Sequence, residues 1–147
     1  MAVQALNHDP QQASALVASG QRVFAIEQGA LAAVAARLGD AFASACALVL
    51  ASGGRVVTCG MGKSGHVARK IAATLASTGT PAFFVHPGEA GHGDLGMITE
   101  GDVVLALSYS GESDEILMLL PVLKRQGNAL IAMTGRVQST LAREADI

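Results

Sequence analysis

Residues 55–65 read Arg-Val-Val-Thr-Cys-Gly-Met-Gly-Lys-Ser-Gly and join a short β-branched run to an amphipathic stretch. The run 55–59 has the length and composition of a buried strand. After it, apolar residues recur every four positions, as on one face of a helix: Val67, Ile71 and Leu75. The glycines between the two patterns mark a strand-to-helix turn. Such a turn directs free backbone N–H groups at one point, where an anion can bind.

Two known phosphate-binding motifs resemble this turn without fitting it. Gly62-Lys63-Ser64 matches the end of a nucleotide P-loop, but Val57 stands where that loop needs its first glycine. The glycines also form G-x-G-x-x-G, yet no acidic residue follows on a strand end about twenty positions later, as in dinucleotide-binding domains. A tight turn without a ligand is the alternative. The charge of Lys63 and the hydroxyl of Ser64 favour anion binding.

Composition predicts one domain with a sizeable core, because half of the 147 residues are apolar. The net charge of −2 gives no reason to expect nucleic acid or a membrane surface as a partner. Cys46 and Cys59 lack metal-type spacing, so we expect buried, reduced thiols and a cytoplasmic protein. The first basic residue is Arg22, and the longest apolar run, 45–51, is too short to span a bilayer.

Residues 1–52 are predicted to be helical. Asp9-Pro10 is typical of a helix start, and a second helix is expected to begin after Asp40 and end at Gly53-Gly54. Apolar residues in the first helix fall seven apart: Val17, Phe24, Leu31 and Leu38. This stripe is either an oligomer contact or part of the core against the following domain, and both interpretations stay open.

From residue 53 onward, apolar strands alternate with amphipathic helices. Strands are predicted at 55–59, 82–85, 102–109 and 129–133, and helices at 64–78 and 113–126. Gly79 and Gly127 are expected to close the helices, and Pro121 to kink the second. The alternation predicts an α/β fold, a three-layer αβα sandwich with a parallel, flavodoxin-like sheet, preceded by an N-terminal helical segment.

A second strand-to-helix junction, residues 108–113, reads Ser-Tyr-Ser-Gly-Glu-Ser. Its three hydroxyls stand at the carboxyl end of a predicted parallel strand, where they can donate to a phosphate. Helix capping by Ser110 or Ser113 is the alternative, although capping needs only one hydroxyl. Glu112, Asp114 and Glu115 follow closely, and a carboxylate beside a phosphate is repulsive, which points to a chemical role for at least one of them.

Residues 86–94 form a glycine-rich segment that carries His86, Glu89, His92 and Asp94. It follows the second strand, so we expect it at the same carboxyl edge as the other two junctions. These side chains could bind a metal, although their spacing is not diagnostic. The alternatives are exposed histidines or contacts with hydroxyl groups of a ligand.

The runs 60–65 and 108–113, with 77–81 and 86–93 between them, strongly resemble the sugar isomerase (SIS) domain of the D-arabinose 5-phosphate isomerase family. The resemblance extends from about Glu27 to Ile147. It implies an aldose–ketose isomerase that interconverts D-arabinose 5-phosphate and D-ribulose 5-phosphate through an enediol and supplies Kdo for lipopolysaccharide. It also implies a cytoplasmic homotetramer with shared active sites and no cofactor.

At the matching positions, the resemblance implies that Lys63 and Glu115 are catalytic. Glu115 would act as, or position, the base, and Lys63 would stabilise the enediolate. Substrate contacts are implied for Gly79, Thr80 and His92, and phosphate contacts for four hydroxyls: Ser64, Ser108, Ser110 and Ser113. His86 matches a histidine associated with inhibitory zinc, not with a catalytic metal.

The family pattern begins its next strand where this sequence reaches Asp146-Ile147. We therefore expect N-terminal helices at 1–52, a C-terminally incomplete βα core at 53–147 and no CBS modules. Three functions stay open: an isomerase, a non-catalytic SIS module that binds phosphosugars in regulation, and an interaction or structural unit. The retention of Lys63 and Glu115 favours the enzyme.

Overall fold

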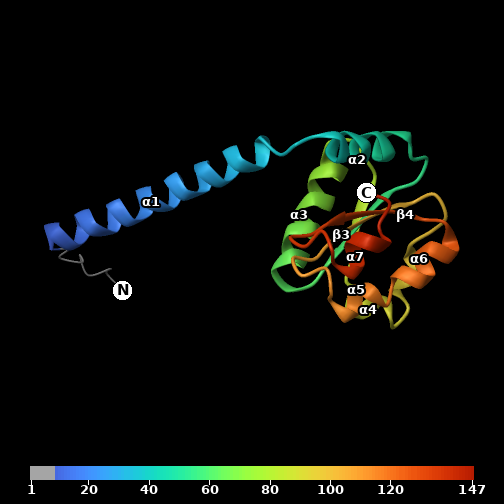
Figure 1. The fold of residues 1–147 in the computed structure, drawn as a ribbon. Coiled ribbons are helices and arrows are strands. Elements are labelled where there is room, and N and C mark those ends of the chain that lie inside the picture. The colour runs from blue at the N-terminus through green and yellow to red at the C-terminus, as the bar shows by residue number, and fades with distance from the viewer. Residues whose placement is uncertain (1–8) are drawn as a thin grey trace. The chain divides into compact units, whose positions relative to one another are not determined.

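The computed structural model describes residues 9–147 and divides the chain after Gly39 into two compact units. The first is the helix α1 (Pro10–Ala35), drawn in blue in Figure 1. It begins as predicted, with the Asp9 side chain accepting a 3.1 Å hydrogen bond from the Gln11 N–H. The boundary predicted near Gly53 differs, because α2 (Asp40–Ala51) belongs to the second unit. Residues 1–8 of the predicted helical range lie outside the described residues.

Helix α1 buries none of its side chains within its own unit. The four apolar residues spaced seven apart are all exposed: Val17, Phe24, Leu31 and Leu38. Within residues 9–147, no single helix is both long enough and apolar enough to cross a membrane. The bent pair of α1 and α2, counted together, has the length and the composition of a membrane span.

The second unit is built on a parallel sheet of four strands in the order β2-β1-β3-β4. Its strands are β1 (Val56–Gly60), β2 (Ala82–Val85), β3 (Val103–Leu107) and β4 (Ala129–Met133). The sequence predicted β2 and β4 to the residue, while β1 is shifted by one residue and β3 is shorter than predicted. In the register, Val57 of β1 lies between Phe83 of β2 and Val104 of β3.

Besides α2, the helices of this unit are α3 (Gly62–Ser77), α4 (Pro87–Ala90), α5 (Asp114–Leu117), α6 (Leu120–Gln126) and α7 (Thr140–Glu144), with a short 3-10 helix at Asp94–Met97. The helix predicted at 113–126 is two helices, because Pro121 falls in the first turn of α6 and cannot continue a preceding helix. Gly127 ends α6 with φ 73°, as expected of a helix-closing glycine.

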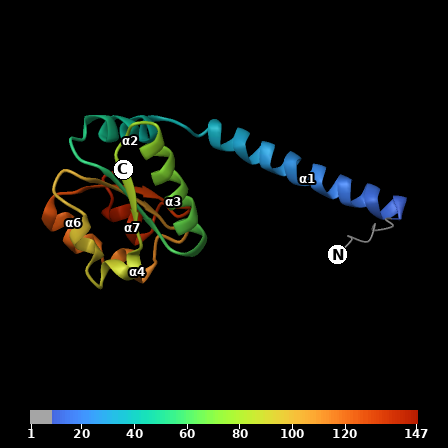
Figure 2. The same cartoon turned by 180° about the vertical axis from the view of Figure 1, so that it is seen from behind.

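The sheet is covered on both faces, which confirms the three-layer sandwich. Successive strand residues point to opposite faces. Val57, Cys59 and Val104 join the main core with residues of α4 to α7. On the other face, Thr58 donates a 2.9 Å hydrogen bond to the Ala68 carbonyl of α3. Figures 1 and 2 show α3 and α6 on opposite sides of the strands.

At the amino edge of the sheet, the buried carboxylate of Asp102 lies just before β3. It accepts hydrogen bonds from the backbone and guanidinium of Arg55 and from the backbone and hydroxyl of Thr99. Burial alone would raise the pKa of Asp102, but the hydrogen bonds from Arg55 and Thr99 outweigh it and lower the pKa to about 2. These bonds join the start of β1 to the start of β3.

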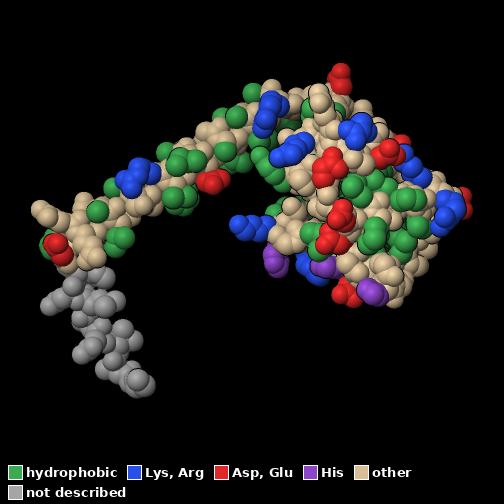
Figure 3. Space-filling view, turned by 60° about the horizontal axis from the view of Figure 1, so that its bottom comes forward, with side chains coloured by type: hydrophobic (Ala, Val, Ile, Leu, Met, Phe, Trp, Pro, Cys, Tyr) green, Lys and Arg blue, Asp and Glu red, His purple; other side chains and the backbone are tan. Residues whose placement is uncertain are grey.

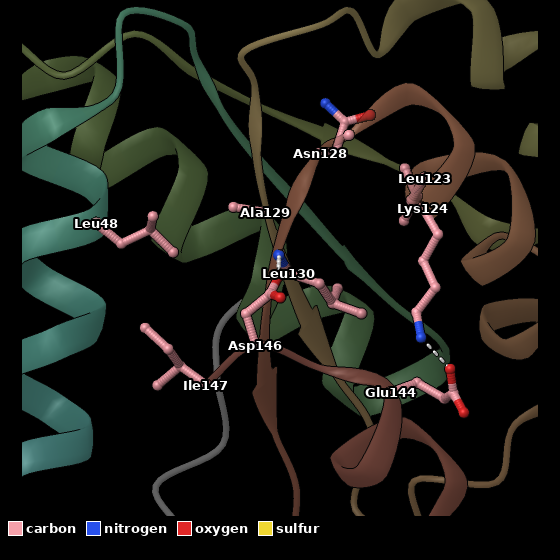
Figure 4. A pocket seen from close by; sticks show the side chains of 10 residues that line it. Leu48, Leu123, Lys124, Asn128, Ala129, Leu130, Glu144, Asp146 and Ile147 are labelled. Atoms are coloured by element: carbon pink, nitrogen blue, oxygen red, sulfur yellow. Dashed lines mark hydrogen bonds and ion pairs between the residues drawn. The ribbon is translucent and has the colours of Figure 1, made fainter.

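At the outer edge of β4, the segment after α7 is tied to the sheet. The Asp146 carboxylate accepts a 2.8 Å hydrogen bond from the Leu130 N–H, and the Ile147 carbonyl accepts one of 2.8 Å from the Ala132 N–H. Figure 4 shows Asp146 turned toward Leu130 beside a hollow of about 500 Å³. Lys124 and Glu144, which border this hollow, are paired with each other.

Candidate functional site

The three segments that the sequence singled out leave the sheet at one edge. The glycine loop (residues 60–65) spans the end of β1 and the first turn of α3, the histidine segment (86–94) follows β2 and the serine loop (108–113) follows β3. Because the strands are parallel, all three lie at their carboxyl ends, where ligands of doubly wound sheets bind. The histidine segment is not wholly a loop, since it contains α4.

The glycine loop brings the end of β1 against the start of α3. A Cβ on Gly65 would lie 2.6 Å from the Gly60 carbonyl oxygen, and a Cβ on Gly60 would lie 2.9 Å from the Ser64 carbonyl carbon. Side chains at these positions would therefore force the two segments apart. The close approach directs the unpaired N–H groups of the first turn of α3 toward the carboxyl edge.

A pocket of about 410 Å³ lies between the glycine loop and the serine loop. It brings together three of the residues predicted for the site: Lys63, Ser64 and Ser108. The rest of its lining is Val67, Leu107, Tyr109, Met133, Thr134 and Gly135. The sequence analysis did not include Thr134 in the site. Thr134 directly follows β4, and this position alone would have predicted that it lies at the same carboxyl edge.

The serine hydroxyls are held by a local network. The Ser108 and Ser113 Oγ atoms are 3.1 Å apart, and Ser108 Oγ accepts from the Gly111 N–H. Ser110 Oγ accepts a 3.2 Å bond from the Glu112 N–H. A serine that accepts an N–H still has its own proton to donate, so this network leaves hydroxyl protons for a bound anion.

The three carboxylates beside the serine loop have different surroundings. The Glu112 Oε1 accepts a 2.7 Å bond from the Thr140 N–H at the start of α7, and this bond lowers the pKa of Glu112. Asp114 is exposed, while Glu115 is half-buried in the first turn of α5. Glu115 is the second residue after this loop and is not among the residues that line the Lys63 pocket.

A smaller hollow of about 180 Å³ lies beside the glycine loop and is lined by His66, Arg69, Phe84 and His86 as well as by the loop glycines. The Arg69 guanidinium lies 3.9 Å from the centre of the Phe84 ring. Figure 3 shows histidines beside basic side chains along one rim of this unit. In the part of the chain that the structure describes, no three His, Cys, Asp or Glu side chains gather as a metal site, and the match of His86 to a zinc-associated histidine stays a prediction.

Three predicted substrate contacts lie outside the Lys63 pocket. His92 is exposed in the histidine segment at the carboxyl edge. Gly79 and Thr80 lie at the amino edge, just before β2, where the Thr80 N–H donates to the Leu75 carbonyl. Lys63 lies at the start of α3 and these two residues lie just beyond its end, so the helix separates them by about 21 Å along its axis. The structure therefore does not bring Gly79 and Thr80 to the pocket within one chain.

An apolar groove of about 440 Å³ lies between α2, α3 and the sheet; Thr80 lines it, and Met133 borders both this groove and the Lys63 pocket. Phe42, Cys46 and Val49 of α2 line it together with Ile71 and Leu75 of α3. It offers no charged group to a substrate and is not part of the candidate site.

Comparison with known proteins links this geometry to a family. The model of the SIS domain matches residues 49–147. Arabinose 5-phosphate isomerase KdsD of Pseudomonas aeruginosa is 61% identical over 129 residues, which are 88% of this chain and 40% of that protein. KdsD of Escherichia coli K12 is 57% identical over 129 residues, 88% of this chain and 39% of that protein. The chain thus spans about two fifths of the length of these curated relatives.

Among solved structures, E. coli CFT073 c3406 in complex with A5P superposes with a TM-score of 0.86 and 46% sequence identity. The match covers 91% of this chain and 71% of that one.

Proposed function

Because the chain belongs to the SIS-domain family, we propose that it forms the phosphosugar-binding part of an isomerase that interconverts D-arabinose 5-phosphate and D-ribulose 5-phosphate. The observation that carries the proposal is the shared pocket of Lys63, Ser64 and Ser108 at the carboxyl edge of β1 and β3. The names of the curated relatives and the complex of c3406 with A5P support this choice of substrate.

The phosphate group is assigned to the serine loop and the start of α3. Ser64 and Ser108, which line the pocket, are assigned as hydroxyl donors, together with Ser110 and Ser113 of the serine loop, which do not line it. The first turn of α3 supplies free N–H groups. Lys63 adds a positive charge at the same pocket. Binding the phosphate in this way orients the reacting carbons at a distance and contributes binding energy to the reaction.

Aldose–ketose isomerisation moves a proton between adjacent carbons through an enediol. This requires a base for a weakly acidic C–H and a positive group at the developing oxyanion. We assign the base role, direct or through positioning, to Glu115, since Glu112 is engaged by Thr140 and Asp114 is exposed. Lys63 is assigned to the enediolate.

The remaining assignments follow from the family. His92 is proposed as a substrate contact at the same edge, and Gly79 and Thr80 could reach substrate only from a second copy of the chain. A homo-oligomer, a tetramer in the family, is supported by the exposed apolar stripe of α1.

We place the reaction in the cytoplasm, as a source of Kdo for lipopolysaccharide. The free thiols of Cys46 and Cys59 agree with a reducing compartment.

The test compares Glu115→Gln and Lys63→Ala with Lys70→Ala, a control that removes an exposed lysine of the same helix. Formation of ribulose 5-phosphate is followed in the chain and in the same chain continued through the full length of its relatives. We expect Glu115→Gln to lower kcat by at least about a hundredfold, with binding of arabinose 5-phosphate changed by less than about threefold.

Equal losses of turnover and binding in Glu115→Gln would contradict the base role. Binding of arabinose 5-phosphate without turnover in both parent proteins would favour the non-catalytic regulatory module. Absence of both binding and turnover in the longer protein would overturn the proposal.

A further inference from the structure

We propose that Glu112 is a positioning residue, whose carboxylate fastens the serine loop to the start of α7 and thereby sets the affinity of the site for the phosphate of its substrate. The inference rests on the proposed function, because it concerns the same phosphate. It adds a residue that does not itself line the Lys63 pocket.

The bond joins segments that are far apart in the sequence. Glu112 Oε1 accepts a 2.7 Å hydrogen bond from the N–H of Thr140, which lies 28 positions later. Thr140 is the first residue of α7, so its N–H has no partner within the helix. Glu112 is exposed, and core packing therefore does not impose this contact.

Two further contacts hold the serine loop against the same segment. The Gly111 carbonyl accepts a 3.0 Å bond from the Leu141 N–H, and the Tyr109 carbonyl accepts one of 3.1 Å from the Gly135 N–H. Gly111 has φ 66°, and a Cβ there would lie 2.0 Å from Ser139 Oγ. The loop and residues 135–141 therefore fit together with no room for a side chain at Gly111.

The bond to Thr140 also affects the groups proposed to bind the phosphate, because the backbone of Glu112 contacts one of them. The Glu112 N–H donates to Ser110 Oγ at 3.2 Å, so a fixed Glu112 also fixes the Ser110 hydroxyl. The same contact reduces the repulsion between the Glu112 carboxylate and a bound phosphate. The side chain of Glu112 is turned to Thr140, and Arg143 and Arg136 add favourable charge on that side, which helps to lower the pKa of Glu112.

Thr140→Pro removes the donor of this bond and Glu112→Ala its acceptor. Proline is tolerated at the first position of a helix, and the preceding Ser139 already has the extended conformation that proline requires, with φ −69° and ψ 161°. Glu112→Gln keeps an acceptor oxygen without the charge. Glu100→Ala is the matched control, because Glu100 is an exposed glutamate at the amino edge.

Titration calorimetry with inorganic phosphate, and with arabinose 5-phosphate, measures the effect. We expect Glu112→Ala and Thr140→Pro each to raise the Kd about tenfold, Glu112→Gln to restore most of the affinity, and the double variant to be no worse than either single one. In the active protein, kcat/KM should fall by about the same factor, because phosphate binding contributes remote binding energy to the reaction. Glu100→Ala should change nothing.

Several results would overturn the inference. These are an unchanged phosphate Kd in Glu112→Ala, additive losses in the double variant, or a lowered melting temperature with normal affinity, which would make Glu112 purely structural. If the parent binds phosphate but does not convert arabinose 5-phosphate, the proposed isomerase fails while the titrations still decide the role of Glu112. If the parent binds no phosphate, both fail.

Discussion

The guanidinium of Arg55 donates two hydrogen bonds to the buried carboxylate of Asp102, from Nε to Oδ1 at 3.1 Å and from an Nη to Oδ2 at 2.7 Å. The two residues precede β1 and β3, the neighbouring strands that carry the glycine loop and the serine loop. This pair at the amino edge therefore fixes the relative position of the strands from which the candidate site is built.

Replacing Asp102 with Asn should destabilise the fold. An amide nitrogen in place of one oxygen would face N–H and O–H donors in a buried position, and we expect a loss of about 2 kcal/mol in the free energy of unfolding. Urea denaturation measures it. Glu144→Gln is the control, since its ion pair with Lys124 is exposed and should contribute far less. Equal effects of the two substitutions would contradict the structural role of Asp102.

The contribution of Asp102 should also depend on pH. Its pKa in the folded protein is lowered from 3.8 to about 2, so the folded chain holds this proton less tightly than the unfolded chain. The stabilisation is complete above the unfolded value and disappears as pH falls through the folded value. Urea midpoints of the wild type and Asp102→Asn should converge between about pH 4 and pH 2. A constant gap across this range would refute the assignment.

Gly65→Ala should disrupt the glycine loop, because its Cβ would lie 2.6 Å from the Gly60 carbonyl oxygen. We expect loss of phosphate binding of at least about tenfold, together with a lower melting temperature. Gly53→Ala is the matched control, since a Cβ there meets nothing within 4 Å. Normal phosphate affinity in Gly65→Ala would show that the close approach of strand and helix is not needed for the site.

The two thiols should differ in reactivity. Burial raises the pKa of Cys59 to about 12, as the expected burial implies, whereas the expected burial of Cys46 was wrong, because Cys46 is exposed on α2. A thiol reagent at neutral pH should therefore label one cysteine per native chain and two in denaturant. Cys46→Ser should abolish native labelling. Rapid native labelling of Cys59 would mean that the core around β1 opens readily.

The stripe on α1 should mediate self-association. Phe24 is 73% exposed, and Phe24→Asp would place a charge in the middle of the apolar stripe. We expect a lower molecular mass in analytical ultracentrifugation. Ala25→Asp, whose neighbours one turn away are Gln21, Arg22, Gln28 and Gly29, should leave the mass unchanged. A wild-type monomer would remove the basis for the homo-oligomer.

Most of the fold was predictable because it rests on local patterns. Short apolar runs and the glycines after helices gave β2 and β4 to the residue. Pro121 was correctly expected to disturb its helix, but a pattern cannot tell a kink from the full break between α5 and α6. The boundary at Gly39 was not predictable, because it depends on how α2 lies beside residues far away in the sequence, such as those that line the apolar groove with it.

The site was predictable only where residues share an edge of the sheet. Lys63, Ser64 and Ser108 follow parallel strands, so their proximity follows from topology. The role of Glu112 could not be read from the sequence, since its partner Thr140 lies 28 residues away. Gly79 and Thr80 came from family resemblance alone, although their place between the predicted helix 64–78 and strand 82–85 indicates the amino edge of a parallel sheet.

The strand order also constrains how the chain can fold. β1 is the first strand in the sequence but lies inside the sheet, so both of its neighbours come later in the chain. Fewer residues separate β1 from β2 than from β3, because Val56 pairs with Ala82 in β2 and with Val103 in β3. The pair of β1 and β3 therefore cannot form before residue 103 is made. During synthesis, β1 therefore has one open edge until β3 arrives, and this interval is when the chain is most exposed to pairing with another chain.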